Sequence, residues 1–215
     1  MTLLSADEVD AVITALTATY PDARPELDFR NPYELMVAVV LSAQCTDKRV
    51  NLVTRELFAR YPCVDDLAAA QYDDVAAIIR TCGLFQTKAR NIIAASQMVR
   101  DSFQSTIPMQ RELLMQLPGV GRKSANVIIS CAGNGNAIAV DTHVFRVSKR
   151  IGLSDGKNVW QVEQDLMQAT PENIWSHLHH ILIFHGRRCC DARKPECLRC
   201  PVNTTCRWPE KRQAD

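Results

Sequence analysis

Apolar residues along this chain recur mainly at the three- and four-residue spacings of amphipathic helices. In the first such stretch, Val9, Val12, Ile13 and Leu16 fall on one helical face. Residues 5–8, Ser-Ala-Asp-Glu, come directly before this face and have the pattern of a capping box, in which a serine and a glutamate satisfy the first amides of a helix. The pattern therefore predicts a helix that begins at this capping box.

The most apolar stretch of the chain is residues 35–41, Leu-Met-Val-Ala-Val-Val-Leu. Such a run is typical of a buried helix or a buried strand. Asn31-Pro32 precedes it, and proline is favoured in the first turn of a helix. Because the run also lacks alternation, we predict a buried helix. The apolar run from Leu35 to Ala43 covers only about half of the ~20 residues that span a bilayer.

Similar spacings and end signals predict a series of further helices with short connections. Their approximate ranges are 46–61, 73–82 (ended by Gly83), 87–103, 111–116, 122–131, 142–150, 159–169 and 172–185. Residues 133–136, Gly-Asn-Gly-Asn, read as a turn, and residues 137–140 as a short extended piece. No stretch alternates as a half-buried strand does, so the sequence predicts an all-α fold.

Composition and charge place the chain among ordinary globular proteins. Its 215 residues suffice for one large domain or two small ones, and the net charge is +1. The charge is uneven: residues 1–40 hold seven acidic and two basic side chains, whereas residues 176–215 hold eight basic and four acidic ones. A basic surface in the second half fits a nucleic-acid partner, although solvated faces also look like this. With acidic residues at the N-terminus and no membrane or export signal, we expect a cytoplasmic protein.

Five of the nine cysteines crowd into residues 189–206. In a reducing compartment such a cluster favours metal ligation over disulfides. Cys190, Cys197, Cys200 and Cys206 are separated by six, two and five residues. Four thiolates this close predict one tetrahedral site, for which zinc and an iron–sulfur cluster both remain candidates. The other thiols outside this segment, Cys45, Cys63, Cys82 and Cys131, are most simply small buried hydrophobes.

Residues 117–124, Leu-Pro-Gly-Val-Gly-Arg-Lys-Ser, join two predicted helices through a glycine-rich turn. Gly119 and Gly121 permit a positive φ or a close approach to the backbone, and amides at a helix N-terminus suit a phosphate oxygen. The spacing fits neither a Walker loop, because Arg122 separates glycine from lysine, nor a dinucleotide fingerprint, which needs a third glycine. What remains is a helix–hairpin–helix that grips the DNA backbone, or a packing corner without a ligand.

Lys123 lies in the first turn of the helix after this hairpin, and Asp141 follows it by eighteen residues. Partial burial, the helix dipole and neighbouring Arg122 would disfavour the charged amine and prepare it for Schiff-base chemistry. The alternative is a lysine that only neutralises phosphate. Asp141 also has an ordinary interpretation as the N-cap of the next helix, and a cap would hold its carboxylate in place.

Three segments together resemble the endonuclease III family, the bifunctional DNA glycosylase/AP lyases of the helix–hairpin–helix superfamily. They are residues 117–127, residues 139–146 (Ala-Val-Asp-Thr-His-Val-Phe-Arg) and the cysteine cluster; residues 41–44 and 83–85 extend the likeness over nearly the whole chain. The resemblance implies that Lys123 attacks C1′ of a flipped, damaged nucleotide and that β-elimination cuts the strand on its 3′ side. It implies that Asp141 stabilises positive charge on the sugar, and it suggests oxidised pyrimidines as substrates.

The resemblance also implies further DNA contacts. Gln44 would fill the gap left by the flipped base and Leu84 would wedge beside the orphaned one, which restores part of the lost stacking. Without the resemblance, Gln44 is a solvated loop residue and Leu84 a core leucine. Gly119, Gly121 and Arg122 would hold the backbone near the lesion. His143 shapes the pocket or is simply a packed, hydrogen-bonded histidine.

For the cysteines the resemblance implies one 4Fe–4S cluster, with a structural role, on Cys190, Cys197, Cys200 and Cys206. Cys189 makes the first ligand ambiguous, and Cys190 is chosen because it restores the family spacing. Arg193 and Lys194 lie in the first loop between ligands, where basic side chains suit phosphate contact.

The expected architecture has two lobes. Residues 25–135 would form a helical barrel that ends in the hairpin at about 110–131, and residues 1–24 with 136–215 would form the cluster domain. Double-stranded DNA with damaged bases or abasic sites would lie between the lobes, with Lys123 facing Asp141. The protein would act as a monomer on the nucleoid, with no membrane partner.

Two other functions compete with this prediction. A monofunctional glycosylase of the adenine-mismatch type shares the cluster and Asp141, but that type usually lacks a lysine at the position of Lys123 and has an extra C-terminal domain. A non-catalytic DNA-binding module would use Lys123 only against phosphate. Trapping a covalent adduct on abasic DNA separates these possibilities.

Overall fold

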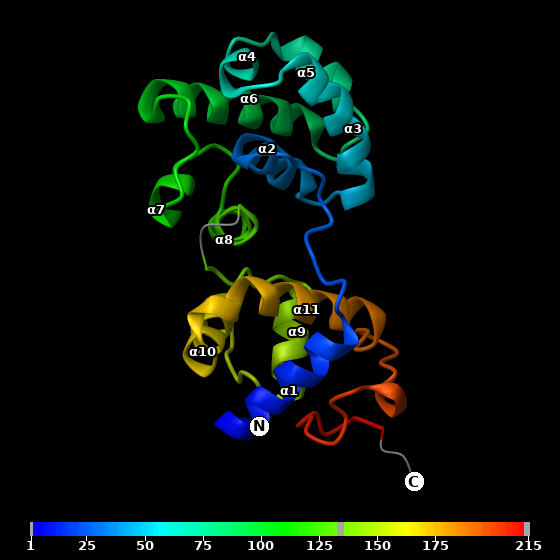
Figure 1. Cartoon of the computed structure of the whole chain (residues 1–215). Helices are drawn as coiled ribbons and strands as arrows, with labels where there is room; N and C mark the ends of the chain where they lie inside the picture. The colour runs from blue at the N-terminus through cyan, green and yellow to red at the C-terminus, as the bar shows by residue number, and fades with distance from the viewer. Residues whose placement is uncertain (1, 133–135, 213–215) are drawn as a thin grey trace. The chain divides into compact units, whose positions relative to one another are not determined.

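The computed structural model describes residues 2–132 and 136–212. In these ranges every regular element is helical and none is a strand (Figure 1). The all-α prediction is confirmed. The predicted turn at residues 133–136 lies almost wholly outside the described residues. No helix within the described ranges is long and apolar enough to cross a membrane.

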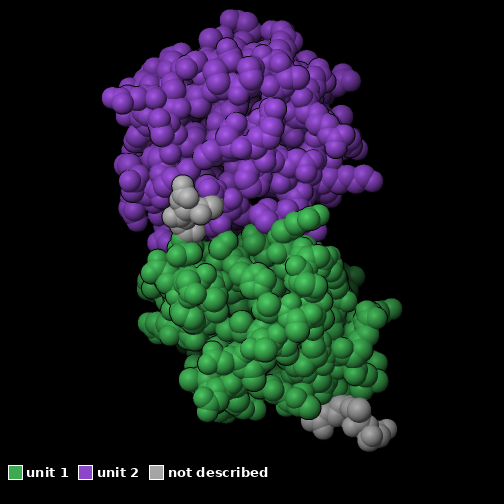
Figure 2. Space-filling model, viewed as in Figure 1, with its two compact units in different colours: residues 1–24, 136–215 green, residues 25–135 purple. Residues whose placement is uncertain are grey.

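The chain divides into two compact units (Figure 2). One is built from a single stretch, Pro25–Gly135, and is called the continuous unit below. The other combines Met1–Arg24 with Asn136–Asp215 and is called the split unit. Each unit buries its own apolar residues.

The continuous unit is centred on α2. Its helices are α2 (Pro32–Ser42), α3 (Asp47–Arg60), α4 (Val64–Ala68), α5 (Tyr72–Ile78), α6 (Phe85–Phe103), α7 (Arg111–Leu114) and α8 (Arg122–Cys131). Every residue of α2 from Tyr33 to Leu41 is buried, and α2 packs against α3, α6 and α8. Helices α4 and α5 cover α6. The predicted buried helix is therefore confirmed: residues 35–41 of α2 are apolar on all sides because other helices surround them.

Two charged side chains are buried in the continuous unit with fixed partners. Glu34 is 2% exposed, and its carboxylate accepts a hydrogen bond from the guanidinium of Arg30 at 2.6 Å. Lys88, in the first turn of α6, is 4% exposed and donates from Nζ to the carbonyl oxygen of Leu41 at 2.9 Å. A buried ammonium requires such a partner, so this bond fixes the start of α6 to the end of α2.

The split unit joins the two ends of the chain. Its helices are α1 (Ala6–Thr19), α9 (Thr142–Ile151), α10 (Val159–Ala169), η1 (Glu172–Ile174), α11 (Trp175–Arg188) and η2 (Cys197–Arg199). Helix α11 packs against both α1 and α9, and one core cluster contains Val12 of α1, Val147 of α9 and Ile181 of α11. The capping box predicted before α1 is confirmed, with reciprocal bonds between Ser5 and Glu8.

Several predicted helix ends differ from the structure. The predicted helix 73–82 ends at Ile78, and Cys82 lies in a separate turn whose amide bonds to the carbonyl oxygen of Ile79. The short helix α4 escaped prediction because five residues show no period. The last predicted helix, 172–185, begins as the 3-10 turn η1 and continues as α11 to Arg188.

Candidate active site and cysteine cluster

The hairpin between α7 and α8 depends on one glycine. Gly119 has φ +84°, a conformation that L side chains rarely adopt. A Cβ atom added there would also lie 3.0 Å from Asn91 Nδ2 and 3.0 Å from Val40 Cγ1. Both the backbone conformation and the packing against α2 and α6 therefore require glycine at this position.

Gly121 has a different role. Its φ of −92° and ψ of 179° are extended values that any residue adopts, and an added Cβ would meet nothing within 4 Å. It is the N-cap residue of α8, and no side chain caps this helix end. The absent side chain leaves the backbone open at the N-terminus of α8, where the helix dipole favours an anion.

Lys123 is an exposed residue in the first turn of α8. The expectation that it is partly buried is wrong for the protein by itself, because at this point of α8 only Ala125 and later residues turn inward. The charge of Lys123 still affects the pKa of Cys131 at the other end of α8. Burial raises the pKa of the Cys131 thiol to about 12, and the positive charge of Lys123 opposes this rise.

The structure brings Gln44 and Leu84 to neighbouring turns of the continuous unit. The position of a Cβ on Gly83 lies 3.4 Å from the carbonyl oxygen of Gln44. Both residues have positive φ, 52° for Gln44 and 57° for Leu84, and both are exposed, Leu84 at 63%. The alternative of Leu84 as a core leucine is therefore wrong. A bulky apolar side chain held outward on a backbone that costs ~1–3 kcal/mol points to a function at this site.

Asp141 belongs to the split unit and caps α9, as predicted. Its Oδ1 accepts the backbone N–H of Val144 at 2.8 Å. Nearby, His143 Nδ1 lies 3.1 Å from a guanidinium nitrogen of Arg146, and its ring packs against Gly186, where an added Cβ would be 3.0 Å from Nδ1. The interpretation of His143 as a packed, hydrogen-bonded histidine is confirmed.

Two arginines four residues apart on α9 hold the start of the cysteine segment. Arg146 donates to the carbonyl oxygens of Gly186 at 2.9 Å and Cys190 at 3.1 Å. Arg150 donates to the carbonyl oxygens of Asp191 and Ala192 and lies 3.6 Å from the Sγ atom of Cys190. Sequence reasoning missed both residues, although their spacing places them on one face of a helix beside the candidate aspartate.

All five cysteines of residues 189–206 line one cavity of the split unit. The other lining residues are Arg150, Ile151, His185, Pro195, Glu196, Asn203, Trp208 and Lys211. The free thiols of Cys189, Cys190 and Cys197 are buried, and those of Cys200 and Cys206 are half-buried. Cys206 also donates from Sγ to the carbonyl oxygen of Arg150 at 3.2 Å. Soft donors that converge on a shielded cavity fit a metal or an iron–sulfur cluster.

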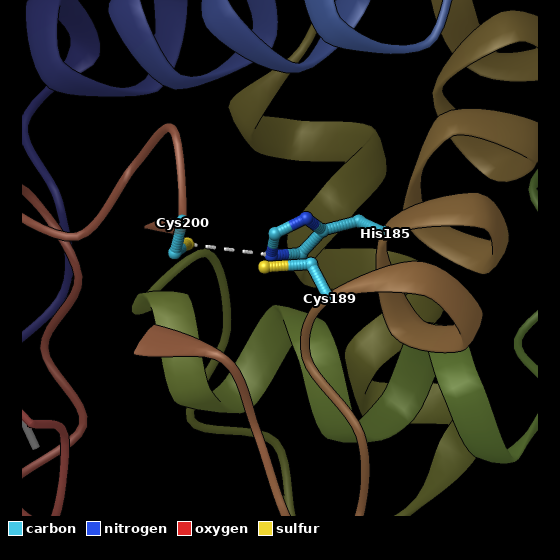
Figure 3. Close-up of side chains that lie close together, drawn as sticks. All are labelled: His185, Cys189 and Cys200. Atoms are coloured by element: carbon cyan, nitrogen blue, oxygen red, sulfur yellow. Dashed lines mark hydrogen bonds between the residues drawn. The ribbon is translucent and has the colours of Figure 1, made fainter. Parts of the chain in front are cut away.

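Three side chains of this cavity lie closest together: His185, Cys189 and Cys200 (Figure 3). Their ligand atoms all lie within 4.8 Å of one another. The hydrogen bond between the two thiols raises the pKa of Cys200 to about 12 and lowers that of Cys189. His185 Nε2 lies 3.7 Å from the Sγ atom of Cys200, and the Tyr20 hydroxyl lies 2.9 Å from Nδ1. Cys189, which the spacing argument set aside, thus faces the cavity together with Cys190.

The loop after Cys190 presents basic side chains. Asp191 Oδ1 accepts the backbone N–H groups of both Arg193 and Lys194, at 2.8 and 2.9 Å, and these bonds lower the pKa of its carboxyl group. Arg193 and Lys194 are exposed and line a surface depression together with Arg199 and Arg212. Glu196 also lines the depression and pairs with Arg199, which leaves an excess of positive charge that suits an anionic partner such as a phosphate backbone.

Comparisons with known proteins agree with this geometry. Residues 37–172 match the family model of the HhH-GPD superfamily base excision DNA repair proteins. Endonuclease III of Bacillus subtilis (strain 168) is 44% identical over 211 residues, which cover 98% of this chain and 96% of that protein. The chain belongs to the endonuclease III family. The protein of the same name from Escherichia coli (strain K12) is 42% identical over 93% of this chain and 95% of that one.

Solved structures of the family have the same fold. A trapped covalent intermediate between an endonuclease III and DNA superposes with a TM-score of 0.89 at 45% identity, covering 95% of this chain and 97% of that one. A thermostable thymine-DNA glycosylase superposes with a TM-score of 0.81 at 22% identity, which shows a shared fold. The predicted resemblance to the endonuclease III family, and with it a base excision repair enzyme, is confirmed.

Proposed function

We propose that this member of the endonuclease III family excises oxidised pyrimidines from double-stranded DNA and cleaves the strand at the resulting abasic site. Lys123 is the nucleophile. Its Nζ atom attacks C1′ of the damaged nucleotide, and the base departs with the electrons of the glycosidic bond and takes up a proton. One of the two amine protons then passes to the ring oxygen O4′ as the C1′–O4′ bond breaks, which opens the sugar and gives an iminium between Lys123 and C1′ that keeps the other proton.

Strand cleavage follows from this iminium. Removal of a proton from C2′ allows the electrons to expel the 3′ phosphate, which is β-elimination, and water then hydrolyses the imine and returns the amine of Lys123. Lys123 is exposed in the protein alone. In the proposed reaction, bound DNA covers this side chain and excludes water from it. This desolvation favours the neutral amine because the charged form loses its hydration.

Asp141 stabilises the positive charge that develops on the sugar and assists proton transfer. The support for this role is its rigid position, because the bond from Oδ1 to the amide of Val144 leaves the carboxylate little freedom. A capping carboxylate is thus held ready without a change of rotamer. His143 takes no step in the proposed reaction, because its Nδ1 atom is paired with the guanidinium of Arg146.

The remaining candidate residues bind DNA without reacting. The amides of α8 after Gly121, together with Arg122, hold a phosphate of the damaged strand, and Gly119 shapes the hairpin that presents them. Gln44 and Leu84 enter the duplex where the base has left the stack. Arg193 and Lys194 bind a further phosphate from the basic depression of the split unit.

We assign one 4Fe–4S cluster to the thiol cavity of the split unit. Cys190, Cys197, Cys200 and Cys206 would hold it: they have the family spacing, they all line the cavity, and the guanidinium of Arg150 lies by the Cys190 sulfur, as is common around metal-bound thiolates. When bound, the cluster ties four thiolates together and fixes the loop of Arg193 and Lys194, and no step of the reaction passes through it. Iron and sulfide analysis distinguishes it from zinc.

The proposed partner is damaged double-stranded DNA, bound by a monomer on the nucleoid in the cytoplasm. A family relative at 45% identity has been solved as a covalent intermediate with DNA, and this chain has a lysine in the first turn after the hairpin. The position of that amine is the observation that carries the proposal.

Borohydride trapping on a duplex with one abasic site tests the proposal. We expect a covalent adduct with the wild type, a lower yield of adduct with Arg122→Ala because a phosphate contact is lost, and no adduct with Lys123→Ala. Arg122→Ala is the matched control because it removes the neighbouring charge and keeps the amine. A wild type that binds this duplex without forming an adduct would show a non-catalytic DNA-binding module. Base release without an adduct would show a monofunctional glycosylase.

A panel of thymine glycol, dihydrouracil and bare abasic duplexes then tests the substrate class. We expect excision of both oxidised pyrimidines at rates that exceed those for undamaged thymine by several orders of magnitude. Cleavage of the abasic duplex alone would restrict the function to that of an AP lyase.

A further inference from the structure

Two neighbouring turns of the continuous unit each carry a cysteine next to a candidate DNA contact. Cys45 follows Gln44, and its amide donates to the carbonyl oxygen of Ser42 at 3.0 Å. Cys82 precedes Leu84 by two residues, and its amide donates to the carbonyl oxygen of Ile79 at 2.9 Å. Both turns are therefore closed by their own backbone bonds.

The two turns are held face to face by contacts that do not involve the thiols. The carbonyl oxygen of Gln44 lies 3.4 Å from the Cβ position of Gly83. The buried Nζ of Lys88 donates to the carbonyl oxygen of Leu41 at 2.9 Å, which ties the first turn of α6 to the end of α2. The distance between the two cysteines is thus set by the fold.

The two cysteines lie in these adjoining turns, and their thiols differ in access to solvent. Cys82 is 2% exposed, whereas Cys45 is half-buried. Burial, together with Cys45, raises the pKa of the Cys82 thiol to about 11, against the opposing charges of Lys88 and Arg49. A small molecule in solution can therefore reach Cys45, whereas the surrounding structure shields Cys82 from it.

We propose that Cys45 and Cys82 are a thiol–disulfide pair that reacts with low-molecular-weight disulfides such as oxidised glutathione. The Cys45 thiolate attacks one sulfur of the small disulfide, forms a mixed disulfide and releases one small thiolate. The Cys82 thiolate then attacks the Cys45 sulfur and releases the second. The two protein thiols are oxidised, the small disulfide is reduced to two thiols, and these take up the two protons.

The second step removes the bound glutathione from Cys45, in the turn that also carries Gln44. Glutathione carries net negative charge, and a mixed disulfide at Cys45 would place this charge beside a residue assigned to the DNA interface, where it would repel phosphate. This consequence rests on the proposed function. Closure onto Cys82 removes the charge and leaves a bond between two turns that already lie together, so the Gln44 turn remains accessible to DNA.

Cys63 provides a comparison within the same unit. The expectation that Cys63 is a small buried hydrophobe is wrong, because it is an exposed thiol that donates from Sγ to Asp66 at 2.9 Å. It follows α3 instead of lying in either turn. Its reaction with oxidised glutathione should stop at the mixed disulfide. Cys63 therefore reports how much reagent reached an exposed thiol in every sample.

The experiment treats the holoprotein with oxidised glutathione, blocks the remaining thiols with an alkylating agent and maps peptides by mass. The visible absorption of the protein is followed in parallel so that the cysteine cavity stays intact. In the wild type we expect a Cys45–Cys82 cross-linked peptide and glutathione on Cys63. In Cys82→Ala, glutathione stays on Cys45, and in Cys45→Ser neither product forms at these turns. Glutathione that persists on Cys45 of the wild type, or Cys82 that remains free to be alkylated after unfolding, would overturn the proposal.

The rate of closure gives a second measurement. Because the thiolate of Cys82 attacks and its pKa is about 11, closure of a preformed mixed disulfide should accelerate by about tenfold per pH unit between pH 7 and 9. A rate independent of pH in this range would contradict attack by Cys82.

Trapping on the abasic duplex separates this inference from the proposed function. After treatment, the wild type should keep its trapping yield, whereas Cys82→Ala should lose it by about tenfold or more because of the added charge. Unchanged trapping by a Cys82→Ala protein that carries glutathione on Cys45 would remove Gln44 from the DNA interface, while the cross-link in the wild type would still support the thiol pair.

Discussion

The turns that carry Gln44 and Leu84 and the segment that carries the cysteines hold irregular backbone in opposite ways. In these two turns of the continuous unit, Gln44 and Leu84 take positive φ, and packed helices on either side maintain them. In the split unit, the cysteine segment has little regular structure, and Arg146 and Arg150 hold its carbonyl oxygens from outside. The first region is fixed by its own core. The second would also depend on the cluster proposed for its thiols.

The largest expected effect is on the cysteine segment. Cys197→Ser should abolish visible absorption and lower the free energy of unfolding of the holoprotein by several kcal/mol, because binding energy at a structural metal site is also folding energy. The matched change in the other unit, Cys131→Ala, removes a half-buried thiol and should cost no more than about 1–2 kcal/mol. Iron content and thermal unfolding are measured for both variants. Full iron content in Cys197→Ser would exclude it as a ligand.

The next effect is on chemistry without loss of fold. Asp141→Asn keeps a side-chain oxygen for the amide of Val144, so the stability should change by less than about 0.5 kcal/mol. Base excision should fall by about 10²–10³-fold, as expected when a charged group that assists proton transfer is lost. Single-turnover excision and denaturant unfolding separate the two. If the loss of folded protein accounts for the whole loss of base excision, Asp141 acts only as the cap of α9.

The two glycines of the hairpin should separate stability from binding. Gly119→Ala meets both a positive φ and a 3.0 Å contact, so the free energy of unfolding should fall by about 1–3 kcal/mol. Gly121→Ala adds a methyl group in open space and should leave stability almost unchanged, yet weaken binding to an abasic duplex several-fold by keeping phosphate away from the backbone. If Gly121→Ala binds as the wild type does, no phosphate approaches there.

The smallest effect on stability is expected at the exposed turn. Leu84→Gly relieves a left-handed backbone but adds freedom to the unfolded chain, so the net change should stay below about 1 kcal/mol. Excision from duplex DNA should fall by about tenfold, because the wedge that replaces lost stacking is gone. Fluorescence of a base analogue opposite the lesion reports the insertion. A variant that excises at the wild-type rate would argue against a wedge.

The sequence predicted what depends on neighbours along the chain. Ser5, Asn31 and Asp141 cap helices, and their signals lie within four residues of what they bond. What depends on neighbours in space was not predictable. The exposure of Lys123 and Leu84, the pairing of Arg150 with the cysteine segment and the presence of Cys189 at the cavity follow from tertiary packing, for which the sequence carries no local signal.

The bonds between the two ends of the split unit impose an order on folding during synthesis. Arg207 pairs with Glu8 across 199 positions of the chain, Arg188 pairs with Asp22, and the Tyr20 hydroxyl reaches His185. At a synthesis rate of ~10 residues per second, α1 waits about 20 s for the partners that bury it. The continuous unit, made entirely in between, can fold on the ribosome first. The apolar face of α1 therefore stays without its native cover until the C-terminal part of the chain has been made.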